Sequence, residues 1–324
     1  MYESLKEVEK MQKLAIVKSA TEETFISGTD YREVANSPTE TVKDRFRNEL
    51  RSFHLLATYE IPSIALMSGF TSSNAFMSAK YRVSTEKSSF QTKGPQFGFF
   101  TDSGSSFYLP RLERNFGIFM GLTGSLVTGY DVKKFGLSTH FVESKSVRDL
   151  EEILVNCEND LDIESVLDEF SSTPTNIESK MNEKLEKIET CFAGLTVEQI
   201  LENLKYDGGD WATETTKILR QVSPISLKVC HRLLSLGRHM SLEDCAKLEW
   251  RLAVQFALRS DLHETCLMDV EGLDMTGSSN KPAWNFETIE EVTEHHLSRF
   301  FGPLPDGDQL KFEMKRSTEG FHVE

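Results

Sequence analysis

The segment from residue 14 to residue 67 begins with the apolar run LAIV (residues 14–17) and ends with SIALM (residues 63–67). Short apolar runs bounded by polar residues predict buried strands. Between them, SPTE at residues 37–40 is a capping box with proline at the first helical position, and it predicts a helix that ends before Pro62. Strand, helix and strand in this order favour an α/β fold with a mainly parallel sheet.

The same pattern continues outward from this segment and then changes. FISG at residues 25–28 and YRV at residues 81–83 predict further strands. From about residue 131 the pattern becomes helical, with amphipathic segments at residues 223–237 and 241–259. We therefore expect an α/β core over residues 1–130 and a helical region over residues 131–324 that packs on it.

Charge and composition exclude several classes of protein. The 324 residues contain 36 Lys and Arg against 51 Asp and Glu, a formal charge of −15 that repels nucleic acid and anionic lipid surfaces. No apolar run approaches the roughly 20 residues that span a bilayer, so we expect neither a nucleic-acid nor a membrane partner. The first ten residues mix acids and bases without an apolar run, so we do not expect them to act as a signal or transit peptide.

Motifs for several common chemistries are absent from the sequence. It contains no Gly-x-Ser-x-Gly elbow, phosphate loop, Gly-x-Gly-x-x-Gly or His-Glu-x-x-His. The five cysteines include no Cys-x-x-Cys pair and the eight histidines are scattered, so we expect no metal site and reduced thiols.

One carboxylate stands where an apolar residue belongs. In the helix after Ser37, Glu49 shares a stripe with four apolar residues: Val42, Phe46, Phe53 and Leu56. Glu49 either snorkels at the edge of this stripe and pairs with Arg45 or Arg47, or reaches into a pocket with a raised pKa.

Two further positions could carry chemistry. Asp102 follows an aromatic run in FGFFTDSGSS (residues 97–106), where it is either an N-cap for the next helix or a catalytic acid or base at the mouth of the sheet. Gly28 permits a tight turn after a short strand, and that turn could aim the Thr29 N–H into a cavity as an oxyanion donor.

In this order and spacing, these features resemble the crotonase (enoyl-CoA hydratase/isomerase) superfamily, and within it the 3-hydroxyisobutyryl-CoA hydrolase family. The supporting motifs reach almost to the end of the chain: YRVSTEK (81–87), YLPRL (108–112), GLSTHFV (136–142), ILENL (200–204), SPISLK (223–228), PAW (282–284) and LKF (310–312).

The resemblance implies a crotonase-like spiral of ββα turns with a C-terminal helical layer. Family members begin with strands that contain Asn-Arg-Pro, so the first strands are expected to be missing here, leaving an open sheet edge. The implied activity is hydrolysis of a short branched hydroxyacyl-CoA thioester to the free acid and CoA, in mitochondrial valine catabolism. CoA is then part of the substrate, and no cofactor is implied. A cytoplasmic location and a homo-oligomer are both compatible with the sequence.

Three site residues carry over from the family. Thr29 takes the first oxyanion position, where the backbone N–H is the donor. Glu49 falls on a substrate-contacting Glu, and Asp102 falls on the active-site Asp.

Three segments depart from the family pattern. SSNA at residues 72–75 replaces the Met-Gly-Gly-Gly loop, so that Asn74 takes the second oxyanion position. Gly94 stands where the family has a principal catalytic Glu, and residues 263–267 are also altered. The sequence thus leaves two readings: a slow hydrolase, or a catalytically degenerate relative that acts as a binding or assembly module. Thiol release from 3-hydroxyisobutyryl-CoA is the assay expected to distinguish them. If no release is seen, Gly94→Glu is the substitution to try, because rescue would identify the missing carboxylate as the cause.

Overall fold

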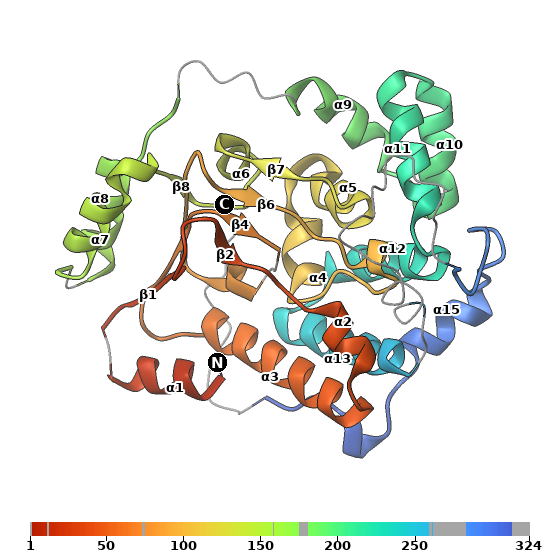
Figure 1. The fold of residues 1–324 in the computed structure, drawn as a ribbon, viewed down its shortest axis with the longest axis horizontal. Helices are drawn as coiled ribbons and strands as arrows, with labels where there is room; N and C mark the ends of the chain where they lie inside the picture. Colours follow the sequence, from red (N-terminus) through yellow and green to blue (C-terminus); the bar gives the residue numbers. More distant parts are fainter. Residues whose placement is uncertain are drawn as a thin grey trace.

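The computed structural model describes residues 2–11, 13–72, 75–157, 159–174, 181–258, 261 and 283–312. Its centre is a pair of four-stranded sheets (Figure 1). The first sheet is parallel and has the order β1 (Ala15–Lys18), β3 (Ser63–Met67), β5 (Tyr81–Ser84) and β8 (His140–Phe141). The second has the order β2 (Thr24–Ile26), β4 (Phe70–Thr71), β6 (Ser89–Phe90) and β7 (Val127–Thr128), with only β7 antiparallel.

The first six strands alternate between the two sheets, which makes this part of the chain a spiral. β1, β3 and β5 enter the first sheet, and β2, β4 and β6 that follow them enter the second. Ile64 lies between Ile16 and Tyr81 in the register of the first sheet, and all five residues of β3 are buried. This burial on both faces explains why residues 64–67 of this strand are continuously apolar. The predicted strands and their parallel pairing are confirmed.

The first long crossover consists of α2 (Tyr31–Asn36) and α3 (Thr39–Ala57). The helix predicted after residue 37 is confirmed, but the predicted capping box is wrong. The N-cap of α3 is Pro38, whose side chain has no hydrogen-bonding atom, and Ser37 is instead the C-cap of α2, where its N–H donates to the Val34 carbonyl.

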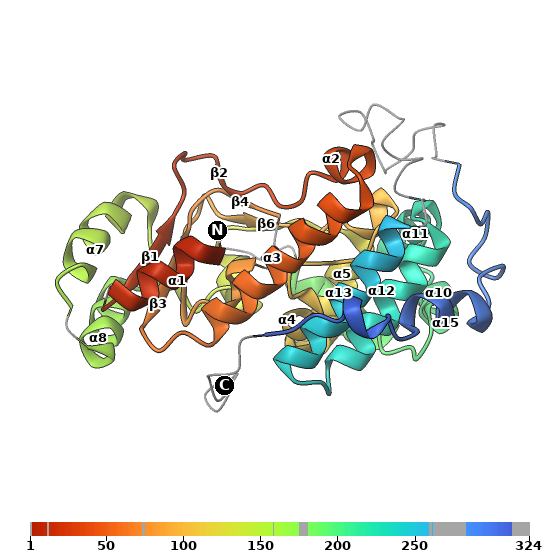
Figure 2. The same cartoon turned by 90° about the horizontal axis from the view of Figure 1, so that it is seen from below.

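Helices cover the sheets, and the helices of the C-terminal region form a layer beside them (Figure 2). The helices before this layer are α1 (Tyr2–Met11), α4 (Ser105–Tyr108), α5 (Phe116–Thr123), α6 (Tyr130–Lys134), α7 (Val147–Leu154) and α8 (Asp160–Phe170). The layer contains α9 (Asn182–Cys191), α10 (Val197–Asp207), α11 (Asp210–Gln221), α12 (Pro224–Gly237), α13 (Leu242–Ala257) and α15 (Glu294–Phe301).

The packing of α13 against α3 places the helical layer next to the predicted site (Figures 1 and 2). One buried cluster joins Phe46 of α3, Phe99 and Phe100 of the following segment, and Phe256 of α13. The Phe99 ring lies 5.4 Å from Phe46 and 5.2 Å from Phe256, centroid to centroid. These contacts fix residues 99–100, which precede Asp102 by two to three positions, between a helix of the core and a helix of the layer.

The observed architecture confirms the predicted α/β class with a helical C-terminal region. β8 lies beyond residue 130 yet pairs with β5 in the first sheet, so the sheet draws on both proposed regions. The boundary at residue 130 stays a prediction. Among the described helices, none is both long enough and apolar enough to cross a bilayer.

Candidate active site

Asp102 is buried, and its carboxylate faces two side chains from the segment after β2. Only 8% of the surface of this residue is exposed. One carboxylate oxygen accepts a hydrogen bond from the Thr29 hydroxyl at 3.0 Å, and the other accepts one from the Tyr31 hydroxyl at 3.5 Å. The next helix, α4, has Gly104 at its N-cap and receives no side-chain bond from that residue. Asp102 is therefore not the N-cap of this helix, and its carboxylate points toward Thr29 and Tyr31.

Glu49 reaches the same place from α3. Its carboxylate accepts a hydrogen bond from the hydroxyl of Ser103, the residue next to Asp102. Arg45 instead pairs with Glu33 at 2.5 Å, and Arg47 pairs with Asp44 at 2.5 Å. The alternative in which Glu49 pairs with a neighbouring arginine is therefore wrong, and the structure brings Glu49 and Asp102 together.

The two carboxylates influence each other's proton affinity. Burial raises the pKa of Asp102 well above its ordinary value, and the charge of Glu49 raises it further, against the lowering effect of the Thr29 hydrogen bond. Burial also raises the pKa of Glu49, which the Ser103 hydrogen bond and the Arg45 charge lower in part. A raised pKa suits a carboxylate that exchanges protons near neutral pH.

Thr29 lies in a turn that depends on glycine. Gly28 has a φ of +79°, and a Cβ there would lie 2.4 Å from the carbonyl oxygen of Ser72. This contact places Thr29 beside the segment that leads to Asn74. Among the described residues, the Thr29 backbone N–H has no hydrogen-bond acceptor. Asn74 lies outside the described residues, as do residues 263–267.

Gly94 has no room for a side chain. A Cβ at this position would lie 1.9 Å from the carbonyl oxygen of Phe100 and 2.4 Å from its carbon. The Gly94 carbonyl also accepts hydrogen bonds from the N–H groups of Phe97 and Phe99, each at 3.0 Å. The Phe100 backbone occupies the space that a side chain at position 94 would need, so Gly94→Glu is not expected to place a carboxylate there without a shift of this backbone.

A third carboxylate near this turn, that of the buried Glu249 of α13, was not predicted. Only 1% of this residue is exposed, and its carboxylate binds the Gly104 N–H and both the N–H and the hydroxyl of Ser106. Burial raises the pKa of Glu249 to about 7, although these hydrogen bonds lower it. The signal was available, because Glu249 lies four residues after buried Cys245 and seven before buried Phe256.

The raised pKa of Asp102 predicts how stability depends on pH. The folded protein keeps a proton on Asp102 at pH values where the unfolded chain has released it, so rising pH lowers the free energy of unfolding. Asp102→Asn cannot ionise, and we expect its stability relative to the wild type to increase between about pH 5 and about pH 8. Urea unfolding at both pH values measures this difference, in which His140 and His231 cancel because both proteins contain them. A difference that stays constant with pH contradicts the prediction.

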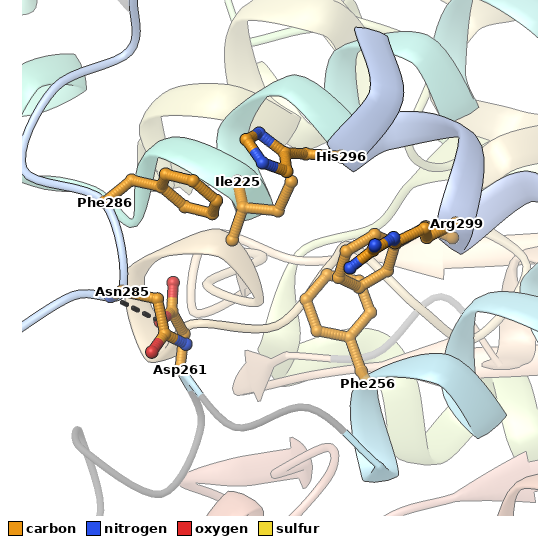
Figure 3. Close-up of a pocket in the computed structure, with 8 residues that line it drawn as sticks. Ile225, Phe256, Asp261, Asn285, Phe286, His296 and Arg299 are labelled. Atoms are coloured by element: carbon orange, nitrogen blue, oxygen red, sulfur yellow. Dashed lines mark hydrogen bonds between the residues drawn. The ribbon is translucent and has the colours of Figure 1, made fainter. Parts of the chain in front are cut away.

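A separate cavity of about 240 Å³ lies in the helical layer (Figure 3). It is lined by Ile225, Phe256, Asp261, Asn285, Phe286, His296, Arg299 and Phe300. The carboxylates of Glu49, Asp102 and Glu249 do not line it. The described residues also contain no group of three or more His, Cys, Asp or Glu side chains placed to hold a metal ion.

A spiral of parallel strands with a helical layer holds two acidic side chains beside the Thr29 turn, and known proteins show to which class such a chain belongs. The sequence model of the enoyl-CoA hydratase/isomerase family matches residues 1–301, and the chain belongs to this family. Two solved structures share the fold. The carnitinyl-CoA dehydratase from Mycobacterium thermoresistibile has a TM-score of 0.85 at 23% identity, covering 97% of this chain and 90% of that chain. The enoyl-CoA hydratase from Rhodobacter sphaeroides has a TM-score of 0.80 at 22% identity, covering 96% and 92%.

Among curated proteins, the chain is similar to several that are named 3-hydroxyisobutyryl-CoA hydrolase, mitochondrial. The Mus musculus and Homo sapiens proteins are each 32% identical, over 92% of this chain and 79% of the relative. The Dictyostelium discoideum protein is 31% identical, over 92% of this chain and 81% of the relative. The resemblance read from the sequence motifs is confirmed at the level of the family.

Proposed function

We propose that this protein hydrolyses a short branched hydroxyacyl-CoA thioester of the 3-hydroxyisobutyryl type to the free acid and CoA. The observation that carries the proposal is the meeting of Asp102 and Glu49 around Ser103, in a buried place bordered by Thr29. The names of the curated relatives support the substrate class. By the same resemblance we propose a mitochondrial location and a role in valine catabolism.

The residues fit an acid-base hydrolysis. The Thr29 N–H, with the proposed Asn74 N–H, would polarise the thioester carbonyl and hold the negative charge that develops on its oxygen. Asp102 would take a proton from the attacking water, whose oxygen bonds to the carbonyl carbon. As the tetrahedral intermediate collapses, the C–S bond breaks and the proton passes to the CoA sulfur. Glu49 would contact the hydroxyacyl group and, through its charge, keep the pKa of Asp102 raised.

A second function is favoured by one observation, the closed packing at Gly94. The family's catalytic glutamate is absent, and the 1.9 Å approach to the Phe100 carbonyl leaves no space for its replacement. A relative that has lost this proton-transfer group and serves as a binding or assembly module is therefore the alternative.

One assay separates the two functions. The purified protein is mixed with 3-hydroxyisobutyryl-CoA and 3-hydroxypropionyl-CoA, and release of the CoA thiol is followed. Turnover in the ordinary enzyme range, about 1 to 10³ per second, supports the hydrolase. If no thiol is released while either thioester still binds in calorimetry, the binding module is supported and the hydrolase is excluded.

The Thr29 side chain provides a further prediction. Thr29→Val keeps the shape and the backbone N–H but removes the hydroxyl that donates to Asp102 at 3.0 Å. Removing the donor of such a hydrogen bond destabilises the ionised carboxylate by about 1–3 kcal/mol. We therefore expect kcat to fall about tenfold or more, with little change in KM. Thr29→Ser keeps the hydroxyl and is the matched control. Equal kcat values for the Val and Ser variants would exclude a role for this hydrogen bond.

A further inference from the structure

The buried carboxylate of Glu249 joins the helical layer to the turn that contains Asp102. Its two oxygens lie 2.8 Å from the Gly104 nitrogen, 2.9 Å from the Ser106 nitrogen and 2.6 Å from the Ser106 hydroxyl oxygen. These three bonds come from residues two to four positions after Asp102. Glu249 thus binds the backbone of the turn that directly follows the proposed catalytic Asp102.

This turn has an unusual backbone that needs support. Ser103 has a φ of 59° and Gly104 a φ of 87°, so two successive residues are in the left-handed region. For a residue with a side chain, such as Ser103, this conformation costs about 1–3 kcal/mol and persists only where the surroundings enforce it. A Cβ at position 104 would lie 2.1 Å from the Phe53 ring, so the turn is also packed tightly. In this conformation the Ser103 hydroxyl reaches Glu49 while the Asp102 carboxylate reaches Thr29.

The backbone N–H groups at the start of α4 need a hydrogen-bond acceptor. If Asp102 were that acceptor, its carboxylate could not face Thr29. An aspartate just before a helix commonly binds such amides itself, as an N-cap. Here Glu249 takes the Gly104 and Ser106 N–H groups, and the Asp102 side chain is left to bind Thr29 and Tyr31. The start of α4 is therefore capped by a side chain of α13, which is distant in sequence.

We propose that Glu249 is the positioning residue of the site: it holds the turn from Ser103 to Ser106 so that the Asp102 carboxylate faces the substrate. The proposal rests on the hydrolase activity proposed above, and it adds a contribution of the C-terminal layer to that activity.

Glu249 also acts on Asp102 through its charge. The ionisable groups that interact with Glu249 are Glu49 of α3, Asp102, Cys230 of α12 and Cys245 of α13. The Glu249 charge raises the pKa of Asp102, in the same direction as the Glu49 charge. Removing it lowers the pKa of Asp102, an effect that a purely structural residue would not have.

The test is Glu249→Gln. The amide can present its oxygen to one side only, so the N–H of Gly104 or of Ser106 loses its acceptor. A displacement of about 1 Å in a reacting group can cost about 10²-fold in rate, so we expect kcat to fall about 10- to 100-fold while KM stays within about threefold. The acidic limb of the kcat/KM profile is expected to move to lower pH. Glu249→Asp keeps the charge, so its acidic limb is expected to stay in place even if kcat falls.

Two variants serve as controls. Glu243→Gln removes the same charge from the first turn of the same helix, where Glu243 pairs with Lys247 at 2.5 Å, and it should leave both kcat and the pH profile unchanged. Leu219→Ala in α11 lowers stability by about 2–5 kcal/mol without touching the turn, and it should reduce stability alone. If Glu249→Gln fails to fold, Ser106→Ala removes one of the three bonds and should show a smaller loss of kcat.

The proposal is overturned if Glu249→Gln behaves like Glu243→Gln in both kcat and pH profile. If the wild type releases no thiol, the hydrolase proposal fails but this one is still tested. Crystal structures of the wild type and of Glu249→Gln should then show a displaced turn, and carbon-13 NMR titration of labelled aspartates should show a lowered pKa for Asp102. An unmoved turn with an unchanged Asp102 pKa excludes the positioning role.

Discussion

Asp102→Asn is expected to lower kcat for thiol release from 3-hydroxyisobutyryl-CoA by about 10²- to 10⁴-fold, the usual contribution of a positioned proton-transfer group. Asparagine keeps the shape of the side chain and can still accept from the Thr29 hydroxyl, but it cannot take a proton from water. KM should change little, because Asp102 would act on the water and the sulfur and not on the CoA moiety. Steady-state kinetics with both thioesters measures the effect.

A matched control distinguishes this effect from a general change of charge. Asp149 is exposed on α7, far along the chain from the site, and Asp149→Asn should be indistinguishable from the wild type. If Asp102→Asn keeps kcat within about threefold of the wild type, proton transfer by Asp102 is excluded, since such transfer is worth at least about 10²-fold.

Gly94→Glu is expected to destabilise the fold by about 3 kcal/mol, at the upper end of overpacking effects, and not to increase activity. The new Cβ would lie 1.9 Å from the Phe100 carbonyl oxygen, which belongs to the backbone and cannot rotate away. Relief requires a shift of residues 99–101, and these lead directly into Asp102. Denaturant unfolding measures the loss of stability, and the thiol assay measures activity on the fraction that remains folded.

A glycine with open space around its Cβ position serves as a control. A Cβ at Gly307 would meet no heavy atom within 4 Å, so Gly307→Ala should leave stability close to that of the wild type, whereas Gly94→Ala should already be destabilised. A Gly94→Glu protein that is as stable as the wild type and hydrolyses faster would contradict the prediction and would show that only a carboxylate was missing.

Much of the fold could be predicted because its signals are local. The run at residues 63–67 is apolar on both faces and became a fully buried central strand. Glu49 was detected because a carboxylate interrupts an apolar helical stripe, and Asp102 because it ends an aromatic run. Each local pattern allowed a second interpretation that only the three-dimensional structure could exclude. Glu49 could have paired with Arg45 or Arg47, but these form ion pairs with other acidic residues. Asp102 could have capped α4, but Glu249 accepts the Gly104 N–H at the start of that helix.

The parts that could not be predicted depend on contacts between distant segments. Ser103 binds Glu49 across 54 positions of sequence, and the left-handed φ that permits this has no clear sequence signature in a non-glycine residue. The closed packing at Gly94 depends on the path of the backbone at Phe100. Glu249 had the same signal as Glu49, a carboxylate in a buried stripe, but its partners lie on a turn that no periodicity within α13 could identify.

The bond between Gly104 and Glu249 joins residues 145 positions apart, and this separation has a consequence for the order of folding. During synthesis, all strands of both sheets leave the ribosome well before α13 does. A nascent chain at that stage can pair its strands, but the turn after Asp102 has no anion to hold it, and long-range contacts of this kind form late. If the protein has the proposed hydrolase activity, the turn that positions Asp102 would therefore be held in place only after most of the chain has been made.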